Sequence, residues 1–350
     1  MKNLKLIALI AGLLSLNACT DEESPQLPKG AYENGYFISN EGPFQNGTGS
    51  ITFVGEDGTV EQNVYKAING EDLGNIVNSI SLAGDHAYMV VNNSNKIVVA
   101  NRYTMQKIAV IEGTGIQNPR YFVANDTRAY VSNWGDPLNP DDDFISVIDL
   151  SSNQIISTIA VGEGPENMQL LQDKLYVTLE GGWSQNNELV IIDTDQNTIV
   201  NTIIIGDVPN SIVEDGARNV WILCGGNPSY ASIETPGALY KLSALDQDVS
   251  YFEFEATEHP DHLSFEGGRL YYNLNGKVYS VESKSVLLPG DAMSGFDGFY
   301  YALKTYNGLL FAADAKDFAS EGSLKVFDLT SGVLLETITT GIMPGDIAFQ

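Results

Sequence analysis

The sequence predicts an all-β fold: a seven-bladed β-propeller of four-stranded antiparallel blades, closed by the C-terminal strand joining the N-terminal blade. Three observations lead to this fold. A unit of 40 to 51 residues repeats along the chain, each unit holds several short β-branched and aromatic runs separated by Gly, Asn and Asp, and the last copy stops after one run. This period and this number of strands are typical of propeller blades.

Each repeat begins with a short phrase, often led by proline, and reaches an aromatic residue 11 or 12 positions later in a second β-branched run. The spacing places two strands and a tight turn in the first half of every unit. The phrases start at Val77, Pro119, Pro165, Pro209, Pro260, Tyr300 and Pro344, and the aromatic residues are Tyr88, Tyr130, Tyr176, Trp221, Tyr271 and Phe311.

The second half of each unit is also repetitive. Runs such as Ile145–Asp149, Leu189–Asp193 and Leu324–Asp328 end in an aspartate, and a polar turn and a further β-branched run follow, as at Ile155–Val161. Four strands per unit result.

The final copy, Pro344–Gln350, provides a single strand. Its partners are expected at the other end of the domain, in Gly35–Asn40, Ser50–Val54 and Gln62–Ala67. Pairing of the two ends gives seven blades and removes the exposed edges of an open sheet.

Composition limits the classes of function. Hydrophobic residues form 43% of the chain, which is enough for a large core, and the net charge is −27. So acidic a protein offers no basic face for nucleic acid phosphates, and it is not attracted electrostatically to anionic lipid.

The first 30 residues carry targeting features and are not expected to belong to the folded domain. Lys2 and Lys5 precede a short apolar run, and Leu16-Asn17-Ala18-Cys19 follows. This pattern resembles the lipobox of bacterial lipoproteins, which implies a signal peptide over residues 1–18 and a lipid on Cys19. An ordinary secretory signal is the alternative.

Residues 20–23, Thr-Asp-Glu-Glu, are similar to the acidic export tag of Bacteroidota surface lipoproteins; the alternative is a solvated linker. The expected organisation is a signal peptide at 1–18, a lipidated, acidic and proline-containing linker at 19–30, and the propeller at 31–350. The resemblance implies an outer-membrane location facing the exterior, with the membrane reached only through the lipid anchor on Cys19.

The repeated Pro-x-x-Ile, Tyr-Val-Ser-Asn, Val-Ile-Asp and Ile-x-Val-Gly phrases resemble those of the YncE-like seven-bladed propellers, over residues 31 to 350. This resemblance implies the fold and says little about function, because propellers carry many unrelated activities.

The connections between the second and third strands are longer than a tight hairpin needs, and they are expected on the face where the innermost strands begin. Long loops on a rigid scaffold are where binding residues concentrate. These loops hold five aromatic residues beside several amides: Phe44, Trp134, Trp183, Tyr230 and Phe318. Aromatic rings beside amides suit a neutral, ring-containing ligand. The alternative is that the rings pack on neighbouring blades.

Polar residues of varied type stand just after the start of each repeat and are expected around the mouth of the central channel. They include Arg120, Glu166, Asn210 and Asp261. These four and the loop amide Asn133, directly before Trp134, complete the candidate ligand-binding set. A solvated channel without function is the alternative.

Metal and catalytic motifs are weak. Asp141, Asp142 and Asp143 form the strongest acidic run and are a candidate calcium site, although a solvated run explains them as well. His259 and His262 flank Pro260, where helical ligand geometry does not apply. No Ser-His-Asp order or nucleophile elbow is visible, so no catalytic residue is assigned and the chain is not expected to be an enzyme.

Lipidation, the acidic tag and the propeller together resemble the surface cobalamin-binding (BtuG-like) lipoproteins of Bacteroidota. The resemblance implies capture of a cobalamin-like corrinoid, as ligand and not as cofactor, for a TonB-dependent outer-membrane transporter. Trp134, Trp183 and Tyr230 are then expected to pack on the corrin ring, and Asn133, Asn210 and Asp261 to meet its amides. Two alternatives stay open: a protein-interaction propeller that docks on a transporter, and a lactonase-like or quinone-dependent enzyme.

Overall fold

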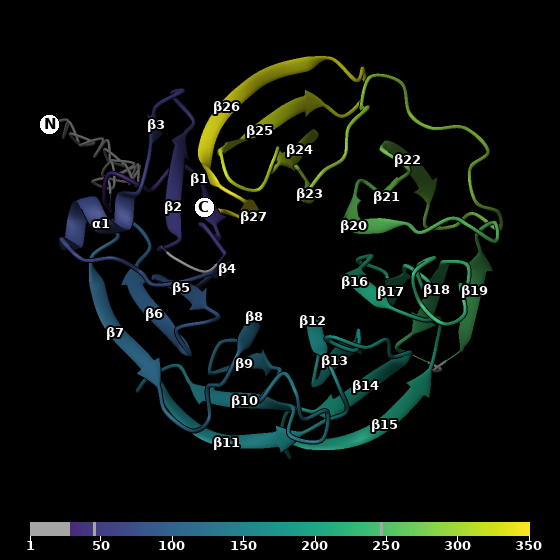
Figure 1. The fold of residues 1–350 in the computed structure, drawn as a ribbon, viewed down its shortest axis with the longest axis horizontal. Coiled ribbons are helices and arrows are strands. Elements are labelled where there is room, and N and C mark those ends of the chain that lie inside the picture. The colour runs from purple at the N-terminus through teal and green to yellow at the C-terminus, as the bar shows by residue number, and fades with distance from the viewer. Residues whose placement is uncertain (1–28, 45–46, 246–247) are drawn as a thin grey trace, which may run out of the picture.

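Seven β-sheets stand around a central axis like the blades of a propeller (Figure 1). The computed structural model describes residues 29–44, 47–245 and 248–350. The proposed signal peptide, Cys19 and most of the linker lie outside these residues. No helix in the described part is long and apolar enough to cross a membrane.

The blades follow one another along the chain, and the first strand of each lies nearest the axis (Figure 1). Blade 1 is β27 (Pro344–Phe349), β1 (Gly35–Asn40), β2 (Ser50–Gly55) and β3 (Val60–Glu61). Blade 2 is β4 (Val77–Ala83), β5 (His86–Val91), β6 (Lys96–Asn101) and β7 (Lys107–Glu112). Blade 3 is β8 (Pro119–Ala124), β9 (Arg128–Asn133), β10 (Phe144–Asp149) and β11 (Gln154–Ala160).

Blade 4 is β12 (Pro165–Leu171), β13 (Lys174–Leu179), β14 (Glu188–Asp193) and β15 (Thr198–Ile204). Blade 5 is β16 (Pro209–Glu214), β17 (Asn219–Cys224), β18 (Ala238–Ser243) and β19 (Val249–Glu253). Blade 6 is β20 (Asp261–Glu266), β21 (Arg269–Leu274) and β22 (Lys277–Glu282). Blade 7 is β23 (Ala302–Tyr306), β24 (Leu309–Asp314), β25 (Glu321–Asp328) and β26 (Leu334–Ile342). The seven-bladed prediction is confirmed.

The core lies between the blades. The recurring aromatic residue of each second strand is buried there, because that strand is flanked on both sides and its side chains reach the neighbouring blades. Tyr88 of blade 2 stacks on Phe122 of blade 3 with ring centroids 4.2 Å apart, and Tyr130 of blade 3 joins a cluster with Leu175 and Val177 of blade 4. The recurring aromatic residues therefore pack neighbouring blades against one another.

Closure of the ring follows the sequence prediction. Strand β27 pairs antiparallel with β1, with Tyr36 opposite Phe349 and Ile38 opposite Ile347. Phe349 also stacks on Tyr306 of blade 7 at 4.2 Å. The two ends of the domain thus share one blade, in which β27 is the innermost strand and β1 is paired on both sides.

One predicted strand is wrong. Residues 62–67 do not extend as a strand; they lead into a short helix, α1 (Val64–Asn69). The helix buries Val64 and Tyr65 against β2 and ends at Gly70 in the left-handed conformation, whose N–H donates to the Lys66 carbonyl oxygen. A buried pair of adjacent residues and a C-terminal glycine favour a helical turn over a period-2 strand.

Blade 6 departs from the four-stranded prediction and has three strands. After β22 the chain runs irregularly through Leu288-Pro289-Gly290, which suits a turn and interrupts a ladder because proline has no N–H. It returns along the sheet edge, where the Met293 N–H donates to the Val278 carbonyl oxygen, and buries Phe296 against Phe327 of blade 7. This segment fills the place of the missing outer strand.

We expect the closure to carry much of the stability. Replacing Ile347, which is 1% exposed in β27, by alanine removes core contacts at the joint, so Ile347→Ala should lower the free energy of unfolding by about 2–4 kcal/mol. The matched change Ile204→Ala, at a side chain 64% exposed on outer strand β15, should cost less than about 1 kcal/mol. Denaturant unfolding measures both, and equal losses would contradict a special role of the joint.

Candidate ligand-binding site at the channel mouth

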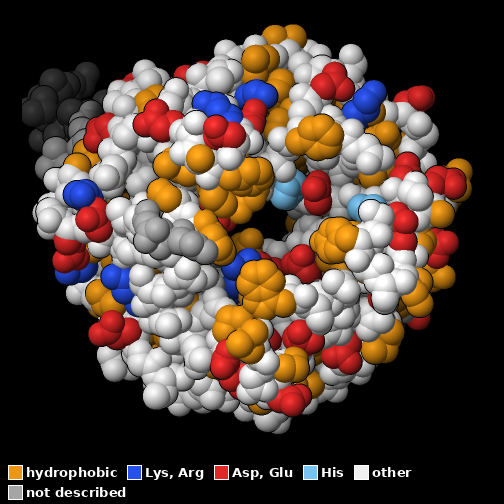
Figure 2. Space-filling model, in the orientation of Figure 1, with side chains coloured by type: hydrophobic (Ala, Val, Ile, Leu, Met, Phe, Trp, Pro, Cys, Tyr) orange, Lys and Arg blue, Asp and Glu red, His pale blue; other side chains and the backbone are white. Residues whose placement is uncertain are grey.

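Strand register places the long loops on the face where the inner strands begin. Pro119 pairs with Asn133, Pro165 with Leu179 and Pro209 with Cys224, so the first residue of each inner strand lies beside the last residue of the second strand. The connections to the third strand leave from this end. In the view of Figure 2, hydrophobic side chains gather around the opening of the channel, with acidic, basic and histidine side chains at its rim.

A register shift near the start of the inner strands turns polar residues toward the axis. The shift lies between Val77 and Ser79, between Pro119 and Phe122, between Pro165 and Met168, between Pro209 and Ser211, and between Asp261 and Ser264. In four of these blades the residue before the strand is left-handed: Ile76, Asn118, Gly164 and Val208. The unpaired residues of such bulges re-aim their side chains. Asn78, Arg120, Glu166 and Asn210 occupy these positions and line the cavity.

The inner strands enclose a cavity of about 860 Å³ around the central axis. Residues along the whole length of the inner strands line it, together with Glu41, Glu180 and Tyr301 from the adjoining loops. A space of this volume is within the range of small-molecule sites in proteins.

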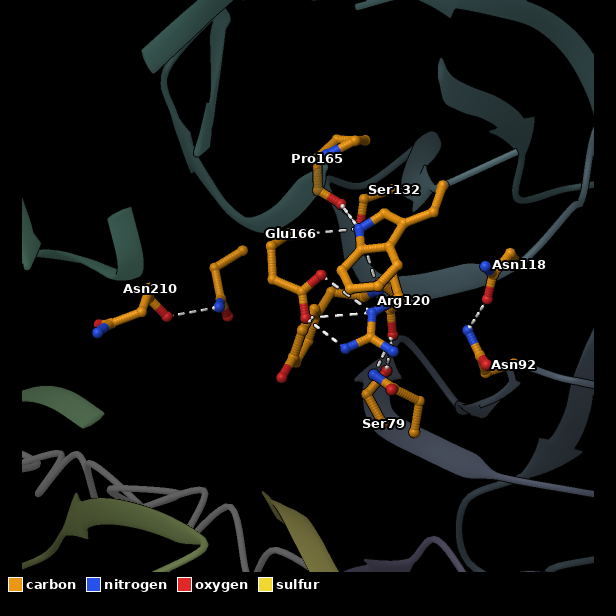
Figure 3. A network of polar contacts seen from close by, with 12 residues as sticks. Ser79, Asn92, Asn118, Arg120, Ser132, Pro165, Glu166 and Asn210 are labelled. Carbon is orange, nitrogen blue, oxygen red and sulfur yellow. Dashed lines mark hydrogen bonds and ion pairs between the residues drawn. The ribbon is translucent and has the colours of Figure 1, made fainter. Parts of the chain in front are cut away.

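The centre of the site is an arginine clamped by a glutamate and an indole (Figure 3). The Arg120 Nε lies 3.0 Å from the Glu166 Oε2, and its Nη2 lies 2.7 Å from the Glu166 Oε1. The Trp134 ring lies 4.2 Å from the guanidinium carbon, and its Nε1 donates to the Pro165 carbonyl oxygen at 3.1 Å. Burial opposes the charge of Arg120, but Glu166 outweighs it and raises the pKa of the guanidinium. Arg120 is therefore fixed in place and charged.

Side-chain hydrogen bonds run from blade to blade around the channel. Asn78 donates to the Arg120 carbonyl oxygen at 2.8 Å, and Asn167 donates to that of Asn210 at 2.9 Å. The remaining junctions use Asn210 to the Pro260 carbonyl oxygen, His262 to the Tyr300 carbonyl oxygen, Lys304 to Asp346, and the Ile80 N–H to Asp346. With the Arg120–Glu166 pair, these bonds link all seven blades into one belt, so the channel walls are rigid.

Three carboxyl groups of the cavity have raised pKa values, each mainly because of burial. The Tyr301 hydroxyl donates to Glu41 at 2.9 Å and partly offsets this rise. Burial and the nearby negative charge of Glu166 raise the pKa of Glu180, and Arg120 opposes them. Burial also raises the pKa of Asp261, whose Oδ1 is buried without a hydrogen-bond partner among the described residues.

The five predicted aromatic residues all lie in second-to-third-strand connections, as expected, but in two different settings. Trp134 reaches the cavity through Arg120, and Phe318 packs edge-on against Tyr301 at 5.7 Å. Phe44, Trp183 and Tyr230 project into solvent, with exposed fractions of 59%, 73% and 86%, and Phe318 is 56% exposed despite its contact with Tyr301. The rings therefore do not pack as a group on neighbouring blades.

Of the predicted amide contacts, that of Asn133 needs correction, whereas Asn210 lies at the cavity. Asn133 is completely buried; its amide donates to the Val131 carbonyl oxygen and to Ser146, and it accepts from the Gln117 N–H. It is a structural residue of blade 3 and has no free group for a ligand. Asn210 lines the cavity; its amide donates one N–H to the Pro260 carbonyl oxygen and accepts from the Ser211 hydroxyl. The first of these bonds joins blades 5 and 6, and the second N–H and the second lone pair of the amide stay available to a ligand.

The acidic run does not converge on one point. Asp142 accepts from the Asp136 N–H, Asp143 accepts from the Gly164 N–H at 2.7 Å, and the Asp141 side chain is exposed in the loop. Within residues 29–44, 47–245 and 248–350, no group of three or more His, Cys, Asp or Glu side chains is placed to hold a metal ion. The calcium alternative therefore gains no support from this geometry.

The sequence analysis missed Glu41, Glu180 and Tyr301. The signal was present in the repeat: Glu41, Trp134 and Glu180 each directly follow the last residue of a second strand, so they hold equivalent positions in blades 1, 3 and 4. Tyr301 directly precedes an inner strand, β23. Aligning blades by strand ends, and not by aromatic type, identifies these positions.

A family model matches residues 34–287, which is more than half of the chain. Its description is a domain of unknown function, DUF5074. The chain belongs to the DUF5074 family. No curated protein matches the sequence.

Solved structures resemble the chain in fold. The hydrazine synthase of Kuenenia stuttgartiensis is 15% identical with a TM-score of 0.63, covering 87% of this chain and 97% of that one. A quinoprotein alcohol dehydrogenase-like protein of Bacteroides thetaiotaomicron is 15% identical with a TM-score of 0.63, covering 91% and 78%. The computationally designed Ika8 protein is 11% identical with a TM-score of 0.58, covering 89% and 91%. At these identities the likeness establishes the propeller fold of this DUF5074 member and nothing about its chemistry.

We expect Glu166→Gln to lower the free energy of unfolding by about 3 kcal/mol, because the largely buried Arg120 would keep its charge without its hydrogen-bonded counter-charge. The double variant Arg120→Met/Glu166→Met should recover most of this loss. Denaturant unfolding checks both. The single variants Arg120→Met and Glu166→Met serve as references. If the double variant loses as much free energy of unfolding as these two single variants together, the coupling is contradicted.

Asp143 gives a prediction for pH. Burial raises its pKa to about 7, although the Gly164 N–H opposes the rise. An unfolded aspartate ionises near pH 4, so stability falls as the pH rises from about 4 to 7, while only the unfolded chain has released its proton. Asp143→Asn should therefore stabilise the protein at pH 8 by on the order of 1–3 kcal/mol and leave it unchanged at pH 4. An equal gain in the free energy of unfolding at pH 8 and at pH 4 would show that ionisation of the Asp143 carboxyl does not cause the stabilisation.

Proposed function

We propose that this protein is an outer-membrane surface lipoprotein that captures a small ring-containing ligand, cobalamin or a related corrinoid, at the mouth of its central channel. The captured ligand passes to a TonB-dependent outer-membrane transporter. The lipid on Cys19 is its only attachment to the membrane. This function rests on the lipobox-like and acidic N-terminal segments together with the composition of the channel face.

The observation that carries the proposal is the set of exposed aromatic side chains on the loops of the face where the channel opens. Trp183 and Tyr230 are 73% and 86% exposed on loops of that face. Exposing large rings costs solvation free energy unless a ligand or partner covers them. Rigid aromatic groups also lose little conformational entropy when a flat ring stacks on them.

The channel mouth adds polar groups to the aromatic surface. Arg120 uses Nε and Nη2 for Glu166, so its Nη1 is available to a ligand carbonyl oxygen, and Glu41 and Glu180 stand on the same rim. Amide groups, which fringe the corrin ring, both donate and accept hydrogen bonds. Donors and acceptors on a fixed wall suit such a ligand.

A second candidate is docking of the same face on a protein. Leu138 and Ile233 are 90% and 71% exposed in the same class of loops, which makes the apolar surface broader than one ring requires. Broad apolar surfaces with a polar rim are typical of protein interfaces. This candidate predicts binding to the transporter without any ligand.

Calorimetric and thermal-shift titration of the purified protein with cobalamin tests the proposal. Binding should raise the melting temperature by mass action, and Trp183→Ala and Tyr230→Ala should each weaken binding at least about tenfold, because each ring buries a large apolar area. Tyr251→Ala, at an exposed tyrosine on outer strand β19, serves as the control and should leave the affinity unchanged. No binding at micromolar protein would overturn the cobalamin proposal and favour docking.

A further inference from the structure

The charges that line the channel are unequal. Among the described lining residues the acids are Glu41, Glu166, Glu180, Glu214, Asp261 and Asp346, and the basic side chains are Arg120, Lys304 and His262. This imbalance lies inside a cavity walled by the inner strands, where charges act more strongly than on the open surface.

Both fully charged basic side chains are already committed to carboxylates. Arg120 is paired with Glu166, and the Lys304 Nζ lies 2.6 Å from the Asp346 Oδ1 and also donates to the Ile347 carbonyl oxygen at 2.8 Å. The His262 Nε2 is used for the Tyr300 carbonyl oxygen. The charges of Arg120 and Lys304 are therefore already matched by carboxylates within the described lining, although the Arg120 Nη1 keeps its N–H groups for a ligand oxygen.

Among the described residues, three acids of the mouth form no close ion pair with a basic side chain, and the nearby charge of Arg120 offsets only part of the pKa rise of Glu41 and Glu180. Glu41 receives only the Tyr301 hydroxyl, Glu180 pairs with no basic side chain in the described chain, and Asp261 has only His262 at 3.9 Å. In the ionised form these carboxylates repel an anion, and in the protonated form they donate a hydrogen bond to a neutral carbonyl oxygen.

We infer that the channel mouth is a charge filter: it accepts neutral amide-bearing or cationic groups and rejects carboxylate and phosphate groups. Glu41, Glu180 and Asp261 are the specificity-determining residues. Specificity here comes from like-charge repulsion as well as from attraction. For the corrinoid ligand, a step that rests on the proposed function, the filter directs the amide-fringed ring toward the channel and keeps the phosphate of the nucleotide loop outside it.

The filter is testable without any ligand, because Trp134 lies on Arg120 at the channel wall and Trp183 is exposed in a loop. In the Trp183→Phe variant, Trp134 is the indole that quenchers reach, and in the Trp134→Phe variant it is Trp183. Trp221 is buried, so quenchers do not reach it in either variant. Fluorescence quenching by iodide, caesium and neutral acrylamide then reports the local potential. The ratio of iodide to caesium quenching should be at least about threefold lower for Trp134 than for Trp183.

Both reporter proteins carry the same net charge, so a lower ratio at Trp134 is a local effect. Adding Glu41→Gln and Glu180→Gln should raise iodide quenching of Trp134 about twofold or more and leave Trp183 unchanged. Since the pKa values of these carboxyls are raised, the filter should be stronger at pH 9 than at pH 6. Equal iodide-to-caesium ratios for the two indoles, or no response to the Gln variants, would overturn the filter.

A second experiment joins the filter to the ligand. Calorimetry compares cobalamin with derivatives in which one amide of the ring is hydrolysed to a carboxylate. The derivatives should bind the unaltered protein at least about tenfold more weakly than cobalamin does. In the double variant Glu41→Gln/Glu180→Gln this difference in affinity should be smaller. Equal affinities would overturn the filter while cobalamin binding stands. If no corrinoid binds, the proposed function fails, and the quenching result still decides the filter.

Discussion

The shift in register near the start of the inner strands is the constraint on which this molecule depends. A regular strand would alternate every side chain between the two neighbouring blades, and nothing would face the axis. One unpaired residue, placed after a left-handed position in several blades, turns Arg120, Glu166 and Asn210 into the channel. At Gly164 this geometry leaves no room for a side chain, since an added Cβ would lie 2.2 Å from the Gly181 nitrogen. Blade-to-blade bonding and the lining of the channel both follow from this local irregularity.

The same residues therefore serve stability and the site together. Arg120 and Glu166 connect blades 3 and 4, and the indole of Trp134 covers the pair. A buried ion pair is a weak source of stability by itself, but it holds its groups in one orientation. Such a fixed guanidinium is useful in a binding site because little entropy is lost when a ligand meets it. The belt of hydrogen bonds sets the electrostatic character of the mouth, and the projecting loops provide the apolar surface.

The likeness to distant propellers concerns the scaffold, and membership in the DUF5074 family, a domain of unknown function, assigns no activity to it. The departures from the regular pattern are local for physical reasons. Blade 6 replaces its outer strand where Pro289 and Gly290 interrupt the ladder, and the helix α1 replaces a strand where adjacent residues Val64 and Tyr65 are both buried. Neither departure touches the inner strands, so the channel keeps its form.

The sequence by itself determined the repeat, the number of blades and the closure of the ring. These features rest on short-range patterns, namely strand period, turn residues and the recurring aromatic side chain, which act within about 50 residues and repeat seven times. It also located the aromatic loops, because loop length and composition are local properties. Only the tertiary structure decided which polar residues are free. Asn133 resembles a surface amide in sequence but is fully bonded inside blade 3, whereas Glu41 and Glu180 lie far apart in the chain and line the same cavity. Such encounters depend on the curvature of the whole ring, which no single repeat contains.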